Sequence, residues 1–306
     1  MRLGATSDEN AALIQGLRDN PILGEIASMR TTFDAEGAAQ ALPEGIAERE
    51  ALLGGRASVW FEGGASDRVV LYLHGGGFAI GSPTSHRHLA GLLAKLAGCA
   101  VVIPDYRLAP EHTFPAALDD AVAAYRDLLK TYPAAHIALA GDSAGGGLVV
   151  ALIAALNQEK LPQPTCAYCI SPWVDLACGS PSLAAKAAQD PVGSAAALTM
   201  LGQMYLGGAD PRHPLASPVC ADLRGAPPML VQVGSAEVLL DDSIELARVL
   251  GHADCSVRLE IWRDMIHVWP LHFPKLPEGR EALEAGAAFI ARALECAHST
   301  QIGSAA

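Results

Sequence analysis

The stretch "HIALAGDSAGGGLVVAL" (residues 136–152) joins an apolar β-run to an apolar helical segment through a glycine-rich turn. At its centre, Gly141-Asp142-Ser143-Ala144-Gly145 forms a G-x-S-x-G pentapeptide. Between a strand and a helix, this pattern predicts a sharp turn that exposes the serine hydroxyl at the carboxyl edge of the sheet, where open α/β folds bind ligands. The helix N-terminus behind the serine favours negative charge. We therefore predict that Ser143 is a nucleophile.

The rest of the chain alternates short apolar runs with segments of helical period, which predicts an α/β fold. Because the runs are continuously apolar, they suit a mainly parallel sheet that is covered on both faces. The predicted strands are 68–74, 99–104, 136–141, 165–171, 228–234 and 256–262, with 57–63 as an antiparallel edge. The predicted helices lie near 85–97, 115–130, 144–158, 241–252 and 279–297.

Composition excludes several classes of protein. The 306 residues are 51% hydrophobic and carry a formal net charge of −12, which argues against disorder and against nucleic acid as a partner. No apolar run is long enough to span a membrane, and the N-terminus lacks the pattern of a signal peptide. The seven cysteines are scattered, and the C-x-x-C at Cys166 and Cys169 lies in a predicted strand, so we expect buried structural thiols rather than a redox or metal site. A cytoplasmic location is the expectation.

Three consecutive glycines follow a strand in "LYLHGGGFAIGSP" (71–83), upstream of the serine. When a serine attacks an ester carbonyl, the oxygen becomes an anion that needs preorganised N–H donors. A backbone loop before the serine turn is where such donors are expected. We predict that the loop Gly75, Gly76 and Gly77, together with the N–H of Ala144, forms an oxyanion hole. His74 is expected to fix this loop rather than to act as a base.

These motifs resemble those of the α/β-hydrolase superfamily, and in particular the bacterial hormone-sensitive-lipase-like carboxylesterases. The resemblance extends to "PDYRLAPEHTFPAALDDA" (104–121), "SPWVDL" (171–176) and "MIHVWP" (265–270), and covers about residues 55 to 295. It implies an α/β-hydrolase fold, with an eight-stranded sheet under a helical cap. The expected division is residues 1–45 for the N-terminal part of the cap, 46–175 and 226–306 for the catalytic domain, and 176–225 for a cap insertion that contains the helix "SAAALTMLGQMYL".

The order of the family's triad, serine then acid then histidine, restricts the base to the C-terminal third of the chain. His267 follows the last predicted strand by five residues, where a loop can return to the serine. His272 is the nearest rival but lacks the family context. The prediction is therefore that His267 takes the proton of Ser143 and later delivers it to the leaving alcohol.

The first three acidic residues after the strand 228–234 are Glu237, Asp241 and Asp242, in "SAEVLLDDSIELARVL" (235–250). Alignment with the family pattern places Glu237 at the position of the acid, where the family usually has aspartate. Asp241 remains the alternative, although Asp241 and Asp242 also suit the capping of a helix.

The resemblance implies a serine carboxylesterase that hydrolyses short-chain acyl esters through an acyl-enzyme, with no metal or cofactor. Amides, lactones or acetylated small molecules are alternative substrates for the same machinery. A non-catalytic ligand-binding relative, like the plant gibberellin receptors, is a further alternative. The expected partner is a small-molecule ester, and the free edge of the last strand also suggests a homodimer.

Overall fold

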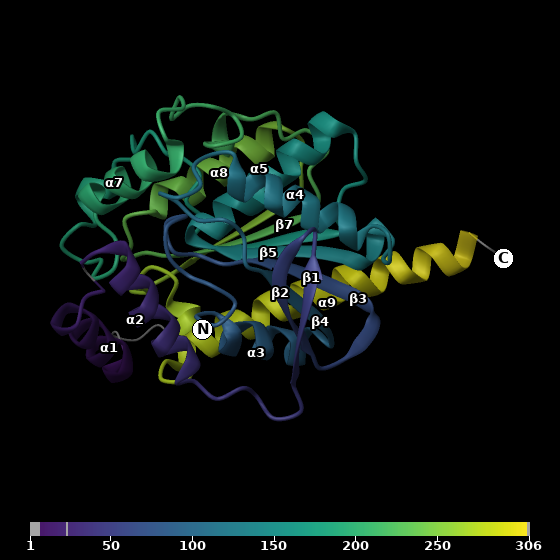
Figure 1. The fold of residues 1–306 in the computed structure, drawn as a ribbon, viewed down its shortest axis with the longest axis horizontal. Coiled ribbons are helices and arrows are strands. Elements are labelled where there is room, and N and C mark those ends of the chain that lie inside the picture. The colour runs from purple at the N-terminus through teal and green to yellow at the C-terminus, as the bar shows by residue number, and fades with distance from the viewer. Residues whose placement is uncertain (1–6, 23, 305–306) are drawn as a thin grey trace.

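The apolar runs pair into one sheet of eight strands, in the order β1-β2-β4-β3-β5-β6-β7-β8 (Figure 1). The computed structural model describes residues 7–22 and 24–304. The strands are β1 (Ala47–Leu53), β2 (Arg56–Glu62), β3 (Ala65–Leu73), β4 (Cys99–Pro104), β5 (Ile137–Asp142), β6 (Cys166–Ile170), β7 (Met229–Gly234) and β8 (Val257–Trp262). Strands β3 to β8 are parallel, and β2 is antiparallel to both of its neighbours. The predicted α/β-hydrolase architecture is confirmed.

The sheet differs from the sequence prediction at its N-terminal edge. The strand predicted at 57–63 is β2, but it is not the edge, because β1 pairs along its outer side. The sequence of β1, AEREALL, is rich in strong helix formers and is largely exposed, so it lacks the apolar pattern of a strand. Its strand conformation comes from pairing with β2, which local sequence does not reveal.

Helices cover both faces of the sheet. The helices α3 (Arg87–Ala97) and α9 (Pro277–Ser304) pack on one face, and α4 (Ala116–Leu128), α5 (Ser143–Glu159) and α8 (Leu240–His252) pack on the other. Each face of the sheet carries its own hydrophobic core, and the side chains of a strand point to the two faces in turn. Cys166 of β6 lies in the core beneath α3 and α9, and Cys169 lies in the core on the other face. Both thiols are free, and burial raises the pKa of each to about 12. The C-x-x-C is therefore a pair of buried thiols on opposite faces.

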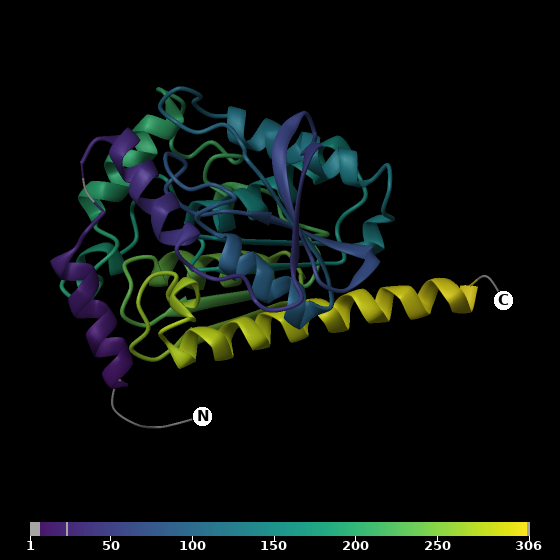
Figure 2. The ribbon, with the colours of Figure 1, turned by 60° about the horizontal axis from the view of Figure 1, so that its bottom comes forward.

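The remaining helices gather at one end of the molecule, beyond the carboxyl ends of the strands (Figures 1 and 2). They are α1 (Asp8–Asp19), α2 (Ile26–Ala38), α6 (Ser182–Ala185) and α7 (Ala195–Leu206). Arg18 of α1 donates to the carbonyl of Ala188 at 2.9 Å, so the two segments assigned to the cap touch. The division into a cap and a catalytic domain stays a prediction, and residues 1–6, 23 and 305–306 of its segments lie outside the described residues.

Helix α9 runs along the sheet and continues past the body of the molecule (Figure 2). Within residues 7–22 and 24–304, no helix combines the length and hydropathy that a membrane span requires. The cytoplasmic location stays a prediction.

Candidate active site

Ser143 occupies a sharp turn between β5 and α5, where it adopts a φ of +52°. A positive φ is uncommon for a residue other than glycine and stores strain, which the surroundings must hold in place. The flanking glycines allow this turn to pack against β3. A Cβ on either Gly141 or Gly145 would collide with the carbonyl oxygen of Leu73, the last residue of β3. The G-x-S-x-G pattern is thus explained by contact with the neighbouring strand.

Three residues from the ends of three different strands form one hydrogen-bonded chain. His267, in the loop after β8, has its Nε2 2.9 Å from the Oγ of Ser143. Its Nδ1 lies 2.7 Å from Oε2 of Glu237, which follows β7. Ser143 and His267 are 8% and 9% exposed, whereas Glu237 is fully buried. The predicted nucleophile, base and acid therefore lie in hydrogen-bonding order.

The carboxylate of Glu237 is fixed by two further donors. Its Oε1 accepts from the hydroxyl of Ser171 at 2.8 Å and from the N–H of Gly234 at 2.5 Å. Ser171 also accepts from the N–H of Val268, next to His267, at 3.2 Å. Ser171 is the first residue of the family motif "SPWVDL", but the sequence alone indicated no role for it. Its contacts show that it joins the acid to the loop of the histidine.

Glu237 also sets the basicity of His267. Burial alone lowers the pKa of His267, but the hydrogen bond and the negative charge of Glu237 outweigh burial, so the pKa lies above its usual value of 6.5. This shift makes the ring a better proton acceptor at neutral pH.

The rival residues have other partners. Asp241 accepts from the N–H of Ser182, and Asp242 accepts from the N–H groups of Val174 and Asp175, so both carboxylates hold the segment after β6. Burial raises the pKa of Asp242 to about 6. Burial lowers the pKa of His272 to about 4, and the ionisable groups that act on it are His88 and Lys275 rather than an acid.

The glycine loop lies beside the serine turn. The N–H of Gly75 donates to Oδ1 of Asp142 at 3.0 Å, so this group is already engaged. In the described part of the chain, the N–H groups of Gly76 and Gly77 have no such acceptor. Both residues have a positive φ, +115° and +60°. Ala144 is the second residue of α5, and a helix leaves its first N–H groups without an internal partner. Gly76, Gly77 and Ala144 thus remain as candidate donors, with Gly75 as their support.

A second buried cluster holds the back of this loop. Oδ1 of Asp142 also accepts from the hydroxyl of Tyr72 at 2.8 Å, and Nε2 of His86 lies 3.3 Å from the carboxylate. Burial would raise the pKa of Asp142, but His86 and Tyr72 outweigh it and hold the pKa below its usual value. The neighbouring His74 is stacked on Tyr106 with ring centroids 4.2 Å apart, and burial lowers its pKa to about 3. A ring this hard to protonate suits the predicted role in fixing the loop.

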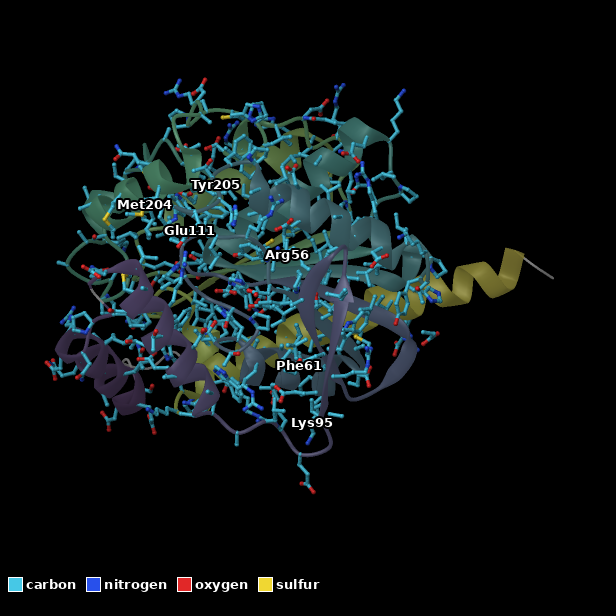
Figure 3. All side chains as sticks on the ribbon, viewed as in Figure 1. Arg56, Phe61, Lys95, Glu111, Met204 and Tyr205 are labelled. Atoms are coloured by element: carbon cyan, nitrogen blue, oxygen red, sulfur yellow. The ribbon has the colours of Figure 1, made fainter. Side chains whose placement is uncertain are left out.

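Helices α2 and α7, which the prediction assigns to the cap, lie beside the same loop. Leu201 of α7 lies against Gly77, where an added Cβ would meet its side chain. Glu111, from the loop after β4, forms an ion pair with Arg30 of α2 at 2.7 Å. Glu111 and Tyr205, a residue of α7, lie at the same end of the molecule (Figure 3). Among the described residues, no group of three His, Cys, Asp or Glu side chains is arranged to hold a metal ion.

Comparison with known proteins places this site in a family. The family described as the alpha/beta hydrolase fold matches residues 70–271. The chain belongs to the alpha/beta hydrolase family. This hydrolase is 51% identical to the acetyl-hydrolase of Streptomyces hygroscopicus over 224 residues, which are 73% of this chain and 75% of the relative.

Solved structures agree with this assignment. An esterase from the bacterial hormone-sensitive lipase family is 40% identical to the hydrolase, with a TM-score of 0.92 over 95% of this chain and 100% of the other. EstE5, in a crystal soaked with p-nitrophenyl butyrate, is 38% identical, with a TM-score of 0.91 and the same coverage. The resemblance to hormone-sensitive-lipase-like esterases, inferred from the motifs, is confirmed.

Proposed function

We propose that this chain, a carboxylic ester hydrolase of its family, hydrolyses short-chain acyl esters through an acyl-enzyme on Ser143. The observation that carries the proposal is the chain of contacts from Ser143 to Nε2 of His267 at 2.9 Å and from Nδ1 to Glu237 at 2.7 Å. Such a chain activates a hydroxyl that is otherwise a weak nucleophile.

In the first half of the reaction, Ser143 Oγ attacks the carbonyl carbon while its proton moves to Nε2 of His267. The carboxylate of Glu237 holds the Nδ1 proton and stabilises the imidazolium. The carbonyl oxygen becomes an anion, which the N–H groups of Gly76, Gly77 and Ala144 receive. The C–O bond to the alcohol then breaks, and His267 returns its proton to the leaving oxygen.

In the second half, His267 takes a proton from water as the water oxygen attacks the acyl carbon. The tetrahedral anion again forms against the same N–H donors. When it collapses, the carboxylic acid leaves and Ser143 recovers its proton from His267. No step requires a group beyond these residues and water.

The preference for short acyl groups is supported by relatives. The acetyl-hydrolase is 51% identical to this chain, and EstE5 was soaked with the four-carbon ester p-nitrophenyl butyrate. We expect a panel of p-nitrophenyl esters to give the highest kcat/KM at about four acyl carbons or fewer, because small-ligand sites are mostly of modest size. Matched amides and lactones in the same panel test the alternative substrates.

The direct test is Ser143→Ala. We expect kcat on p-nitrophenyl butyrate to fall by about 10⁴-fold or more, because the nucleophile is lost. A fluorophosphonate probe should label the wild type and not the variant. Turnover that persists in Ser143→Ala would contradict the mechanism, and a wild type that resists the probe would point to a binding protein instead.

We also propose a homodimer through β8, as the sequence suggested. In the described residues β8 pairs with β7 alone, and it is the last strand of the sheet. An exposed edge strand offers unpaired N–H and C=O groups to a second copy. Light scattering after gel filtration should give twice the 31.7 kDa of one chain. A single-chain mass at all concentrations would rule this out.

A further inference from the structure

A chain of polar contacts runs from helix α2 to the back of the glycine loop. The hydroxyl of Ser82 donates to Asp34 of α2 at 2.5 Å, and the N–H of Ser82 donates to Oγ of Ser85 at 2.9 Å. Oγ of Ser85 lies 2.8 Å from Nδ1 of His86. His86 then contacts Asp142, which accepts from the N–H of Gly75. We call Asp34, Ser82, Ser85, His86 and Asp142 the polar chain.

The ionisation of Asp142 fixes the direction of its contact with His86. Because the pKa of Asp142 is below its usual value, its carboxylate is ionised and can only accept. Nε2 of His86 must therefore carry a proton. Oγ of Ser85 lies 2.8 Å from Nδ1 of His86 and donates to the carbonyl of Ser82 at 2.9 Å, so Ser85 joins the ring to the segment of Ser82. Polar contacts thus run without a break from helix α2 to the buried carboxylate.

Helix α2 is held close to the segment that follows the glycine loop. A Cβ on Gly37 would collide with the backbone of Ser85, so the helix touches that backbone directly. Arg30 of the same helix donates to the carbonyls of Ala79 and Ala109, each at 2.8 Å. Phe33 packs edge-on against the ring of His86, with centroids 5.5 Å apart. With Asp34, three side chains of α2 therefore reach the polar chain and its loop.

We infer that Asp34 and Ser82 are positioning residues for the oxyanion hole, acting through His86 and Asp142 on the peptide of Gly75. The inference rests on the proposed function. The N–H of Gly75 is bound behind the loop, and its orientation sets that of the next two peptides, which carry candidate donors. Since these donors bind charge that exists only in the transition state, loosening the polar chain should lower kcat and leave KM nearly unchanged.

The test compares acids on one helix. Asp34 is half-buried, so Asp34→Ala should fold, and Asp34→Asn keeps an oxygen that can accept from Ser82. Glu36→Ala removes an exposed acid two residues away and serves as the matched control. We measure kcat and KM on p-nitrophenyl butyrate, and inhibition by butylboronic acid, which forms a tetrahedral adduct on a reactive serine.

We expect Asp34→Ala to lower kcat and to weaken boronate binding by the same factor, about 5- to 20-fold. This is less than the 10²- to 10³-fold cost of deleting a donor outright. Asp34→Asn and Glu36→Ala should stay within about 2-fold of wild type, and KM should change by less than about 2-fold throughout. Ser82→Ala should lower kcat by a similar factor, whereas Ser82→Thr, which keeps the hydroxyl, should have a kcat close to that of the wild type.

Three results would overturn the inference. They are a wild-type kcat in Asp34→Ala, an equal loss in Glu36→Ala, and a loss confined to KM. These outcomes differ from failure of the proposed function, in which the wild type itself would show no turnover that depends on Ser143. With turnover intact in the wild type, each result bears on the polar chain alone.

Discussion

Two buried carboxylate–histidine pairs flank Ser143, the proposed nucleophile: Glu237 with His267, and Asp142 with His86. Their surroundings are alike, because each carboxylate also accepts from one hydroxyl and one backbone N–H. The two pairs differ at the far nitrogen of the histidine, which is the ring nitrogen that does not contact the carboxylate. In His267 this nitrogen faces Ser143 at 2.9 Å, whereas in His86 it faces the hydroxyl of Ser85.

This difference indicates how one arrangement can serve two purposes. A histidine whose far nitrogen meets a reactive hydroxyl can move a proton during the reaction. A histidine whose far nitrogen is bound within a loop can only hold that loop in place. We therefore propose proton transfer for the first pair and support of the oxyanion hole for the second, and variants of each pair should separate the two roles.

The largest effect is expected from removing the charge of the first pair. Glu237→Gln keeps the size of the side chain but no longer stabilises the imidazolium of His267, so kcat should fall by about 10³- to 10⁴-fold. Steady-state turnover of p-nitrophenyl butyrate measures this loss. Glu237→Asp, which keeps the charge, should retain clearly more activity. If Asp241→Asn were the damaging change and Glu237→Gln the mild one, the assignment of the acid would be wrong.

A smaller loss is expected from the loop that the second pair supports. In Gly76→Ala the new Cβ would meet the carbonyl of Ile80 at a φ of +115°, so the loop must shift. Displaced donors should cost about 10²- to 10³-fold in kcat. The control is Gly55→Ala, since Gly55 has a φ of +83° with open space around it.

Gly55→Ala should cost about 1–2 kcal/mol of unfolding free energy, through backbone strain, and leave kcat unchanged. Chemical denaturation and turnover measure the two quantities separately. Equal losses of kcat in both glycine variants would show that strain, rather than the position of the donors, governs the effect.

A smaller loss than that of Gly76→Ala should come from the second carboxylate. Asp142→Asn keeps an oxygen for Gly75 and Tyr72 but turns an NH₂ group toward His86, which loosens the loop without removing a donor. We expect kcat to fall by about 10- to 30-fold, with KM within about 2-fold of wild type. A loss as large as that of Glu237→Gln would show that Asp142 takes part in the chemistry.

The sequence was informative where chemistry depends on a local pattern. The G-x-S-x-G turn, the glycine triplet and "MIHVWP" each carry their residue in a continuous motif, so Ser143, Gly76, Gly77 and His267 could be proposed before the fold was known. Glu237 required alignment with the family pattern, because helix capping offered a competing explanation for nearby acids.

Other features depend on residues that are far apart in the chain. Ser171 meets Glu237 across 66 positions, and Ser82 meets Asp34 across 48. A serine in a loop has no local signal that reveals such a partner. The engagement of Gly75 by Asp142 likewise depends on how β3 and β5 lie side by side, and β1 depends on pairing with β2. Tertiary contacts of this kind follow from the fold rather than from a motif.

The most direct test of the account is the pH dependence of kcat/KM in the wild type, Glu237→Gln and Asp142→Asn. His267 must be neutral to accept the proton of Ser143, so activity should fall as the pH drops through its pKa. In the wild type this acidic limb of the pH profile should lie above pH 6.5, because Glu237 raises the pKa of His267 against the effect of burial. Glu237→Gln should move the limb to lower pH, and Asp142→Asn should move it much less. An unmoved limb in Glu237→Gln, or a larger shift in Asp142→Asn, would contradict the division of roles between the two pairs.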